Sequence, residues 1–260
     1  MHAVDPSEVA SVRVWMATLG AMLALVLAAC APVPARNPLA SWVPSPHHDA
    51  RRPVLIVLHF TDEASLARSL AILRSANASG PVSAHYLLGT DGHIYQLVAD
   101  DERAWHAGAG RWGTITDVNS ASIGIELVND GHAPFPDAQI DGLLVLLADL
   151  TMRWRIPPSQ VIGHEDLAPA RKLDPGPRFP WARLAAAGYG LWPRVPLVDP
   201  PPGFDPWLAL AAIGYPLDDR AAAVRAFRHH FRSLEGEALE ADDLRVLYAL
   251  ARQLEGDAGP

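Results

Sequence analysis

The sequence VLIVLH, residues 54–59, decides the fold class of this chain, because it is an unbroken run of branched aliphatic residues that ends in a histidine. Such a run is typical of a β-strand that is buried on both faces. After it, Leu66, Leu70 and Leu73 recur with the spacing of one helix face, and we expect Thr61 and Asp62 to cap that helix. The sequence therefore predicts a buried strand followed by a helix that packs on a sheet.

Further elements of both kinds follow this strand and helix. HYLLG and HIYQLVA flank Thr90-Asp91-Gly92, which is typical of a hairpin, and SIGIELVN, residues 122–129, predicts another strand. Residues 137–154 carry the apolar stripe of an amphipathic helix, QVIG leads from a short strand into His164, and WARLAAAG, residues 181–188, predicts a last helix. Because strands and helices do not alternate strictly, we expect an α/β (mixed α+β) fold with a central mixed β-sheet flanked by helices.

Two proline-rich segments, residues 31–52 and 192–206, divide the 260 residues. We predict a signal peptide at 1–29, a Pro/Ala-rich tether at 30–52, the main domain at 53–195 and a small helical domain at 196–260. In this last domain Val224, Phe227 and Phe231 share one helix face, and about three helices are expected.

The N-terminus resembles that of a bacterial lipoprotein. Residues 15–29 are uncharged, and they are fewer than the roughly 20 that a membrane-spanning helix needs. They end in LAAC, residues 27–30, which is similar to a lipobox with Cys30 as the lipidated residue. An ordinary signal peptide cut after an Ala-x-Ala site, with Cys30 incidental, is the alternative. Since residue 31 is alanine and not aspartate, we expect an outer-membrane lipoprotein that faces the periplasm.

The net charge of the chain limits the kinds of partner that it can bind. The net charge is −8, and removal of residues 1–29, which contain Asp5, Glu8 and Arg13, leaves about −7. An acidic chain of this kind has no electrostatic footprint for nucleic acid. Attachment to a membrane would therefore occur through acyl chains and not through charge.

Three residues at the ends of predicted strands suit a catalytic metal. His59 ends the first strand, His164 follows another, and Asp174 lies in the segment after His164. Two histidines and a carboxylate, with water in the fourth position, are typical of catalytic zinc. A single histidine at a strand end is more often hydrogen-bonded than metal-bound, so only the combination indicates a metal.

Five segments in order carry a resemblance to a known family: VLIVLHF, VSAHYLLGTDGHIYQLV, RAWHAG, NSASIGIELVN and GHEDLAPARKLDPGPRFPW. Over residues 53–190 the chain resembles the zinc-dependent N-acetylmuramoyl-L-alanine amidases, whose fold is shared with phage amidase lysozymes and peptidoglycan recognition proteins. It is most similar to the cell-wall recycling amidases and their lipoprotein relatives, which have Asp as the third metal ligand where the phage enzymes have Cys. The C-terminal helices resemble small peptidoglycan-binding modules, with a structural cap as the alternative.

The resemblance assigns roles to the motif residues. It implies one Zn²⁺ per chain, held by His59, His164 and Asp174, with Glu126 and Lys172 as catalytic residues. A carboxylate can move the proton of the attacking water and a cation can stabilise the oxyanion. In an extended segment Lys172 and Asp174 project to one side and Leu173 to the other. Without the resemblance, Glu126 would be a salt-bridged strand residue and Lys172 a solvated loop cation.

Other residues near the motifs have weaker claims. His85 is expected to be a structural histidine or one that lies near the active site, and Trp105 and His106 lie in a Gly/Ala-rich loop that suits a sugar or peptide, with a buried core tryptophan as the alternative. Asn119 is expected to orient a loop, and Asp166 to hold the loop or the second nitrogen of a ligand.

The predicted function is hydrolysis of the amide bond between MurNAc, or 1,6-anhydro-MurNAc, and L-alanine of the stem peptide. The expected partners are peptidoglycan or muropeptides, and the chain is expected to be a monomer. A non-catalytic peptidoglycan-binding receptor on the same fold is the alternative, which retention of all three ligands disfavours. The absence of an H-E-x-x-H helix argues against a metalloprotease.

Overall fold

A computed structural model describes residues 36–50, 52–77 and 80–257. The predicted signal peptide and Cys30 lie outside these residues. Within them, no helix has the length and the apolar composition needed to cross a membrane.

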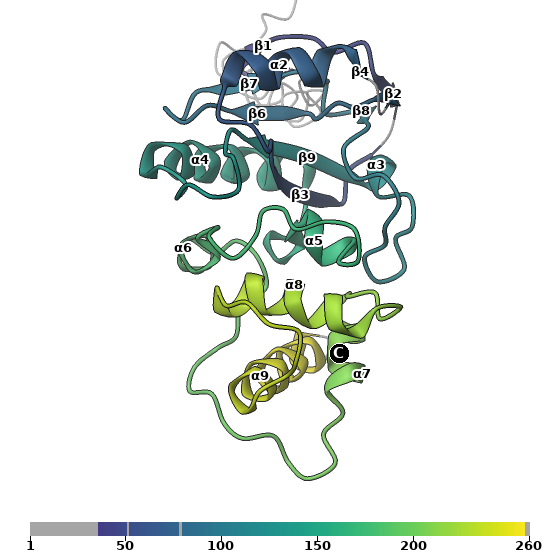
Figure 1. The fold of residues 1–260 in the computed structure, drawn as a ribbon, viewed down its shortest axis with the longest axis vertical. Helices are drawn as coiled ribbons and strands as arrows, with labels where there is room; N and C mark the ends of the chain where they lie inside the picture. Colours follow the sequence, from purple (N-terminus) through teal and green to yellow (C-terminus); the bar gives the residue numbers. More distant parts are fainter. Residues whose placement is uncertain (1–35, 51, 78–79, 258–260) are drawn as a thin grey trace, which may run out of the picture. The chain divides into compact units, whose positions relative to one another are not determined.

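A six-stranded sheet lies at the centre of the fold (Figure 1). All neighbouring strands are parallel except β6 and β7, which form the predicted hairpin around residues 90–92, so the sheet is mixed as expected. In spatial order the strands are β1 (Ser41–Trp42), β7 (Ile94–Gln96), β6 (Tyr86–Leu88), β9 (Ser122–Leu127), β3 (Leu55–Phe60) and β10 (Val161–Gly163). Two short ladders flank it: β2 (His48–Ala50) with β8 (Glu102–Ala104), and β4 (Ala76–Asn77) with β5 (Gly80–Pro81).

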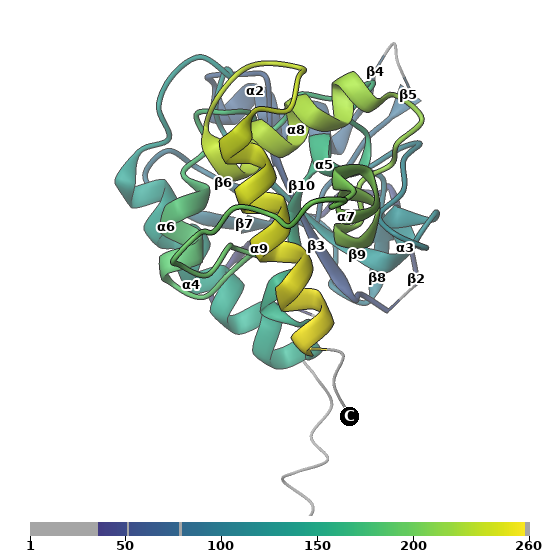
Figure 2. The ribbon, with the colours of Figure 1, turned by 90° about the horizontal axis from the view of Figure 1, so that it is seen from below.

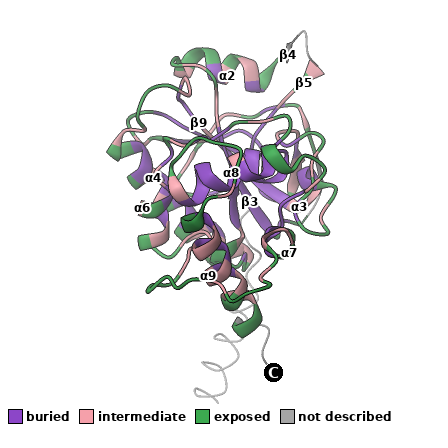
Figure 3. Ribbon diagram, turned by 60° about the horizontal axis from the view of Figure 1, so that its bottom comes forward, coloured by how far each residue is buried: buried purple, intermediate pink, exposed green. Residues whose placement is uncertain are grey.

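Strand β3 is buried on both faces because two separate cores meet at it. Ile56 and Leu58 belong to a core that includes helix α4 (Asp137–Trp154) and helix α6 (Trp181–Ala186). Leu55 and Val57 point the other way, into a core with the C-terminal helices. The alternation of side chains along a strand thus explains why a continuous apolar run is needed here. Figure 3 shows β3 in the buried interior, and only its last residue, Phe60, is partly exposed.

The C-terminal helices cover one face of the sheet (Figure 2). They are α7 (Pro206–Ile213), α8 (Arg220–Arg232) and α9 (Ala241–Asp257), the three that the sequence predicted. Three shorter helices precede them: α3 (Val118–Ala121), η1 (Pro158–Gln160) and α5 (His164–Leu167). The described residues form one compact unit, so the described part of the C-terminal segment, 196–257, shares a core with the main domain. The boundary at residue 195 between the main domain and a small helical domain therefore stays a prediction.

Two local predictions are wrong. Helix α2 (Leu66–Arg74) is capped by Ser65, whose side chain accepts from the Arg68 N–H. Thr61 and Asp62 do not cap it, because a bridge between Glu63 and Asn129 keeps the chain extended beyond them.

The predicted tether is also too long. Its residues from 37 onward belong to the fold, because β1 and β2 pair with β7 and β8. The buried Asn37 donates its backbone N–H to Gln96 Oε1. These strands have two and three residues, which is too short for a periodic pattern in the sequence.

Candidate metal centre and active site

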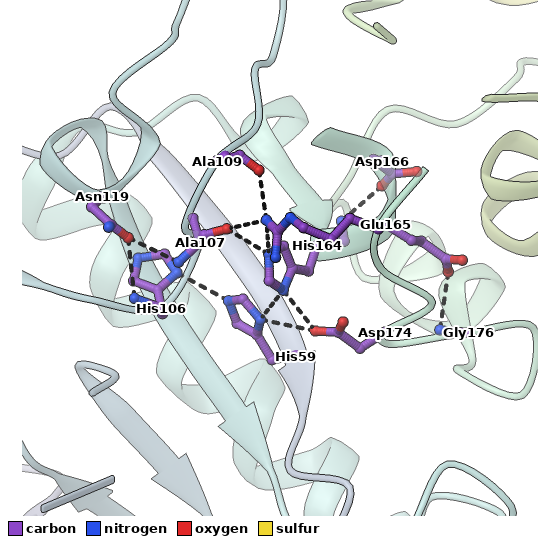
Figure 4. A network of polar contacts seen from close by, with 12 residues as sticks. His59, His106, Ala107, Ala109, Asn119, His164, Glu165, Asp166, Asp174 and Gly176 are labelled. Atoms are coloured by element: carbon purple, nitrogen blue, oxygen red, sulfur yellow. Dashed lines mark hydrogen bonds and ion pairs between the residues drawn. The ribbon is translucent and has the colours of Figure 1, made fainter. Parts of the chain in front are cut away.

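Three buried side chains converge at the carboxyl ends of β3 and β10 (Figure 4). His59 Nδ1 lies 2.9 Å from both His164 Nδ1 and Asp174 Oδ2, and His164 Nδ1 lies 3.0 Å from the same oxygen. Because β3 and β10 are parallel neighbours, they deliver the two histidines to the same edge of the sheet. His164 is the first residue of helix α5, so a helical turn fixes its backbone.

The second nitrogen of each histidine is also engaged. His164 Nε2 lies 2.8 Å from the carbonyl oxygen of Ala107, which can only accept, so this nitrogen carries the proton and Nδ1 carries a lone pair. We expected Asp166 either to hold the loop or to contact this nitrogen. Its carboxylate accepts from the Gly163 N–H, from His230 and from the Tyr215 hydroxyl, which fits the first alternative.

A chain of donors assigns the tautomer of His59 as well. The Ser122 hydroxyl donates to the Val118 carbonyl and therefore accepts from His106 Nε2, at 3.1 Å. His106 Nδ1 must then accept, and it lies 3.0 Å from His59 Nε2. By this network His59 donates through Nε2 and presents a lone pair at Nδ1.

Two imidazole lone pairs and a carboxylate oxygen thus face one point with no proton between them. These three atoms carry negative charge or partial negative charge, so they repel one another at about 3 Å, and a cation between them removes the repulsion. Burial lowers the pKa of His59 to about 4, so its ring is neutral at pH 7. Burial acts to raise the pKa of Asp174, but His164 and His59 outweigh it and hold that pKa below its usual range. The donor set therefore fits a metal ion. Among the residues that the structure describes, these three form the group that could hold one.

Glu126 lies beside this cluster. It is the register partner of His59 on β9, and its Oε2 atom is buried without a hydrogen-bond partner. Burial and the charge of Asp174 raise the pKa of the Glu126 carboxyl well above its usual value, whereas Lys172 opposes the shift. A carboxyl group with a raised pKa and a free oxygen can accept and return a proton.

Lys172 borders the same cavity of about 800 Å³ as Glu126 and the three candidate ligands. Its ammonium group also acts to lower the pKa of His59, which places the cation within electrostatic range of the cluster. Leu173, expected to point away, is 54 % exposed but also borders the cavity, whereas Asp174 is buried.

The other predicted residues separate into two groups. Trp105 and His106 border the cavity, and the Trp105 ring stacks on His47 with 5.1 Å between ring centroids. His85 and Asn119 instead support the backbone. His85 accepts from the Gly124 N–H and contacts the Glu102 carbonyl, while Asn119 Oδ1 accepts from the N–H groups of His106 and Ala107 and so orients their loop as expected.

Sequence reasoning missed several residues that shape the site. Arg171 donates to the carbonyl oxygens of Ala107 and Ala109, and Arg225, His229 and Glu235 of the C-terminal segment border the cavity. The apolar stripe of α8 was visible in the sequence. Its polar residues gave no signal, because their partners near residue 165 lie more than 50 residues away in the chain.

The fold and the site define a protein with a candidate metal site at the edge of a mixed sheet, beside a buried carboxyl oxygen without a hydrogen-bond partner. Residues 49–177 match the family model for N-acetylmuramoyl-L-alanine amidase (Amidase_2). The chain is 36% identical to the 1,6-anhydro-N-acetylmuramyl-L-alanine amidase AmpD of Escherichia coli K12, over 56% of this chain and 90% of AmpD. It belongs to this amidase family.

Longer relatives also match. The chain is 41% identical to N-acetylmuramoyl-L-alanine amidase AmiD of E. coli K12, over 56% of each chain, so it spans about half the length of that relative. The structure of AmiD with the substrate anhydro-N-acetylmuramic acid-L-Ala-D-γ-Glu-L-Lys superposes with a TM-score of 0.68 at 34% identity, over 78% of this chain and 91% of that one. AmpDh3 of Pseudomonas aeruginosa superposes with a TM-score of 0.70 at 32% identity, over 78% and 93%.

Proposed function

We propose that this chain is a zinc-dependent N-acetylmuramoyl-L-alanine amidase that holds one Zn²⁺ through His59, His164 and Asp174. The observation that carries the proposal is the convergence of three unprotonated donor atoms beside the unpartnered carboxyl of Glu126. Nitrogen and oxygen donors in this number, next to an open cavity, are typical of catalytic zinc.

The reaction adds water across the amide bond that joins the lactyl group of MurNAc to L-alanine. When bound, a zinc ion would acidify a water molecule and polarise the carbonyl. Glu126 takes a proton from the attacking water and delivers it to the leaving nitrogen as the C–N bond breaks. Lys172 stabilises the negative charge that develops on the carbonyl oxygen. A carboxylate remains on the sugar and a free amine on L-alanine.

The alternative of a non-catalytic receptor has less support. A receptor needs neither a complete set of metal ligands nor a carboxyl of raised pKa, yet both border one cavity here. We further propose 1,6-anhydro-MurNAc peptides as substrates, because two relatives of known structure were crystallised with anhydro-muropeptides.

The test is digestion of purified sacculi and of anhydro-muropeptides, side by side, with mass spectrometry of the products. We expect stem peptides that begin with free L-alanine, together with the sugar that carried them. Peptides cut between amino acids would indicate a peptidase. A folded, zinc-loaded protein that cleaves neither substrate would overturn the proposal.

For location we propose a monomeric lipoprotein, anchored through Cys30 in the outer membrane and facing the periplasm. The LAAC sequence at residues 27–30 and the alanine at position 31 support it.

A further inference from the structure

Helix α8 carries two consecutive histidines that contact two consecutive acidic residues of α5. His229 Nδ1 lies 2.7 Å from Glu165 Oε2, and His230 Nδ1 lies 2.7 Å from Asp166 Oδ2. All four side chains are buried. Because Glu165 directly follows the candidate ligand His164, the C-terminal helices reach the metal centre through these contacts.

Glu165 connects the two segments that supply metal ligands. Its Oε1 atom accepts from the Gly176 N–H at 3.0 Å, two residues after Asp174. Its own backbone N–H donates to the Asp174 carbonyl at 2.8 Å. A rotation of the Glu165 carboxyl group would break its contact to Gly176 and so remove one of the two bonds that hold the segment of Asp174 against α5.

His229 holds that carboxylate in place. It lies between two carboxylates, with Nε2 at 2.9 Å from Glu235 Oε2, and it borders the cavity. A carboxyl group as buried as Glu165 cannot replace a lost partner with water. Without the His229 contact, the Glu165 side chain would lose a buried hydrogen bond and would rotate to find another.

We infer that His229, a residue of the C-terminal helices, is a positioning residue for the metal centre: through Glu165 it sets the distance between His164 and Asp174. This inference rests on the proposed metal site. It gives the C-terminal helices a role in the amidase centre itself, whether or not they also bind peptidoglycan.

Two isosteric variants separate the contacts of His229. In His229→Asn the amide takes the place of Nδ1 and can still donate to Glu165. In His229→Gln the amide reaches the place of Nε2 and keeps only the contact to Glu235. Asp243→Asn is the control for general damage, because Asp243 is a buried partner of Arg228 and Arg232 between α8 and α9 and does not contact Glu165.

The zinc affinity of each metal-free protein is measured by competition with a chromophoric chelator. The visible spectrum of the cobalt(II) form reports the ligand geometry. We expect His229→Gln to bind zinc about tenfold more weakly, the lower end for outer supports of a metal site, and to change the cobalt spectrum. His229→Asn should keep the parent affinity and spectrum, and Asp243→Asn should lower the melting temperature only.

Parent-like zinc affinity and cobalt spectrum in His229→Gln would overturn the inference, as would equal weakening in His229→Gln and Asp243→Asn. A parent protein that bound no zinc would overturn the proposed function as well. Failure of the inference can thus be told apart from failure of the proposed function, because in the first case the parent would still bind zinc.

Discussion

His59 and Glu126 are directly opposite each other on the parallel strands β3 and β9. In a parallel ladder, register partners project from the same face, so the backbone hydrogen bonds of the sheet place the proposed base beside a proposed metal ligand. Glu126 therefore owes its position to the rigid core of the fold and not to a loop.

Replacement of Glu126 by glutamine should separate metal binding from turnover. The amide keeps the shape of the side chain but cannot accept the proton of the attacking water. We expect kcat to fall by ~100-fold or more, with zinc content at the parent level. Zinc analysis and steady-state kinetics on an anhydro-muropeptide measure both. If zinc content fell in step with the rate, Glu126 would be a support for the site and not its base.

Lys172→Ala should remove stabilisation of the oxyanion. We expect a loss of about 10²-fold in kcat, on the scale of removing one oxyanion donor, without loss of zinc. Arg178→Ala is the matched control, because Arg178 also borders the cavity as a cation but is not a cause of the Glu126 pKa shift. Comparable losses of kcat in both variants would mean that Lys172 contributes only general positive charge.

Removal of a ligand should abolish zinc binding and activity together. His164→Ala or Asp174→Ala leaves two donor atoms, and the same loss of activity should follow treatment of the parent with a chelator. His132→Ala is the control, because His132 is exposed at the cavity but is not part of the cluster. Full activity of the metal-free parent would contradict the zinc mechanism.

Much of the fold could be predicted because its strong signals are local. The apolar run at Val54–His59 and the helical stripe at 137–154 lie where the structure has β3 and α4. The cap at Thr61 was wrong because a long-range bridge to Asn129 competes with local capping. The edge strands at Ser41–Trp42 and His48–Ala50 were missed because short edge pairing leaves no periodicity.

The part of the candidate site that lies within the sequence motifs was predictable. His59, His164 and Asp174 come together as the motif implied. The residues that support the ligands could not be predicted, because His229 contacts Glu165 although it lies 64 residues further along the chain. A polar pair of this kind depends on how the C-terminal helices pack on α5, and helix periodicity alone does not specify that packing.

The lipid anchor is tested at Cys30. We expect the parent to fractionate with the outer membrane and Cys30→Ser to be released into the periplasm, because stable attachment needs more than one acyl chain and the variant would carry none. Fractionation followed by immunoblotting measures this. A variant that stays in the outer membrane would contradict the anchor. A parent that is itself soluble would favour ordinary cleavage after an Ala-x-Ala site.

The buried pair Glu165–His229 should make the stability of the protein depend on pH. Burial raises the pKa of Glu165 to about 8, above its ordinary value of 4.5. Burial acts to lower the pKa of His229, but its two carboxylate partners outweigh burial and raise it. A raised pKa means that the folded state binds the extra proton, so this stability is fully present below about pH 4.5 and is lost as the pH rises towards 8.

The variant Glu165→Gln has no side chain at this position that titrates in this pH range. The unfolding free energy of the metal-free parent, relative to that of Glu165→Gln, should therefore fall with rising pH by at most about 1.4 kcal/mol per pH unit for each proton released. Denaturant unfolding of both proteins between pH 5 and about 8 measures the difference, and a difference that grew with pH would mean that Glu165 is held as a carboxylate.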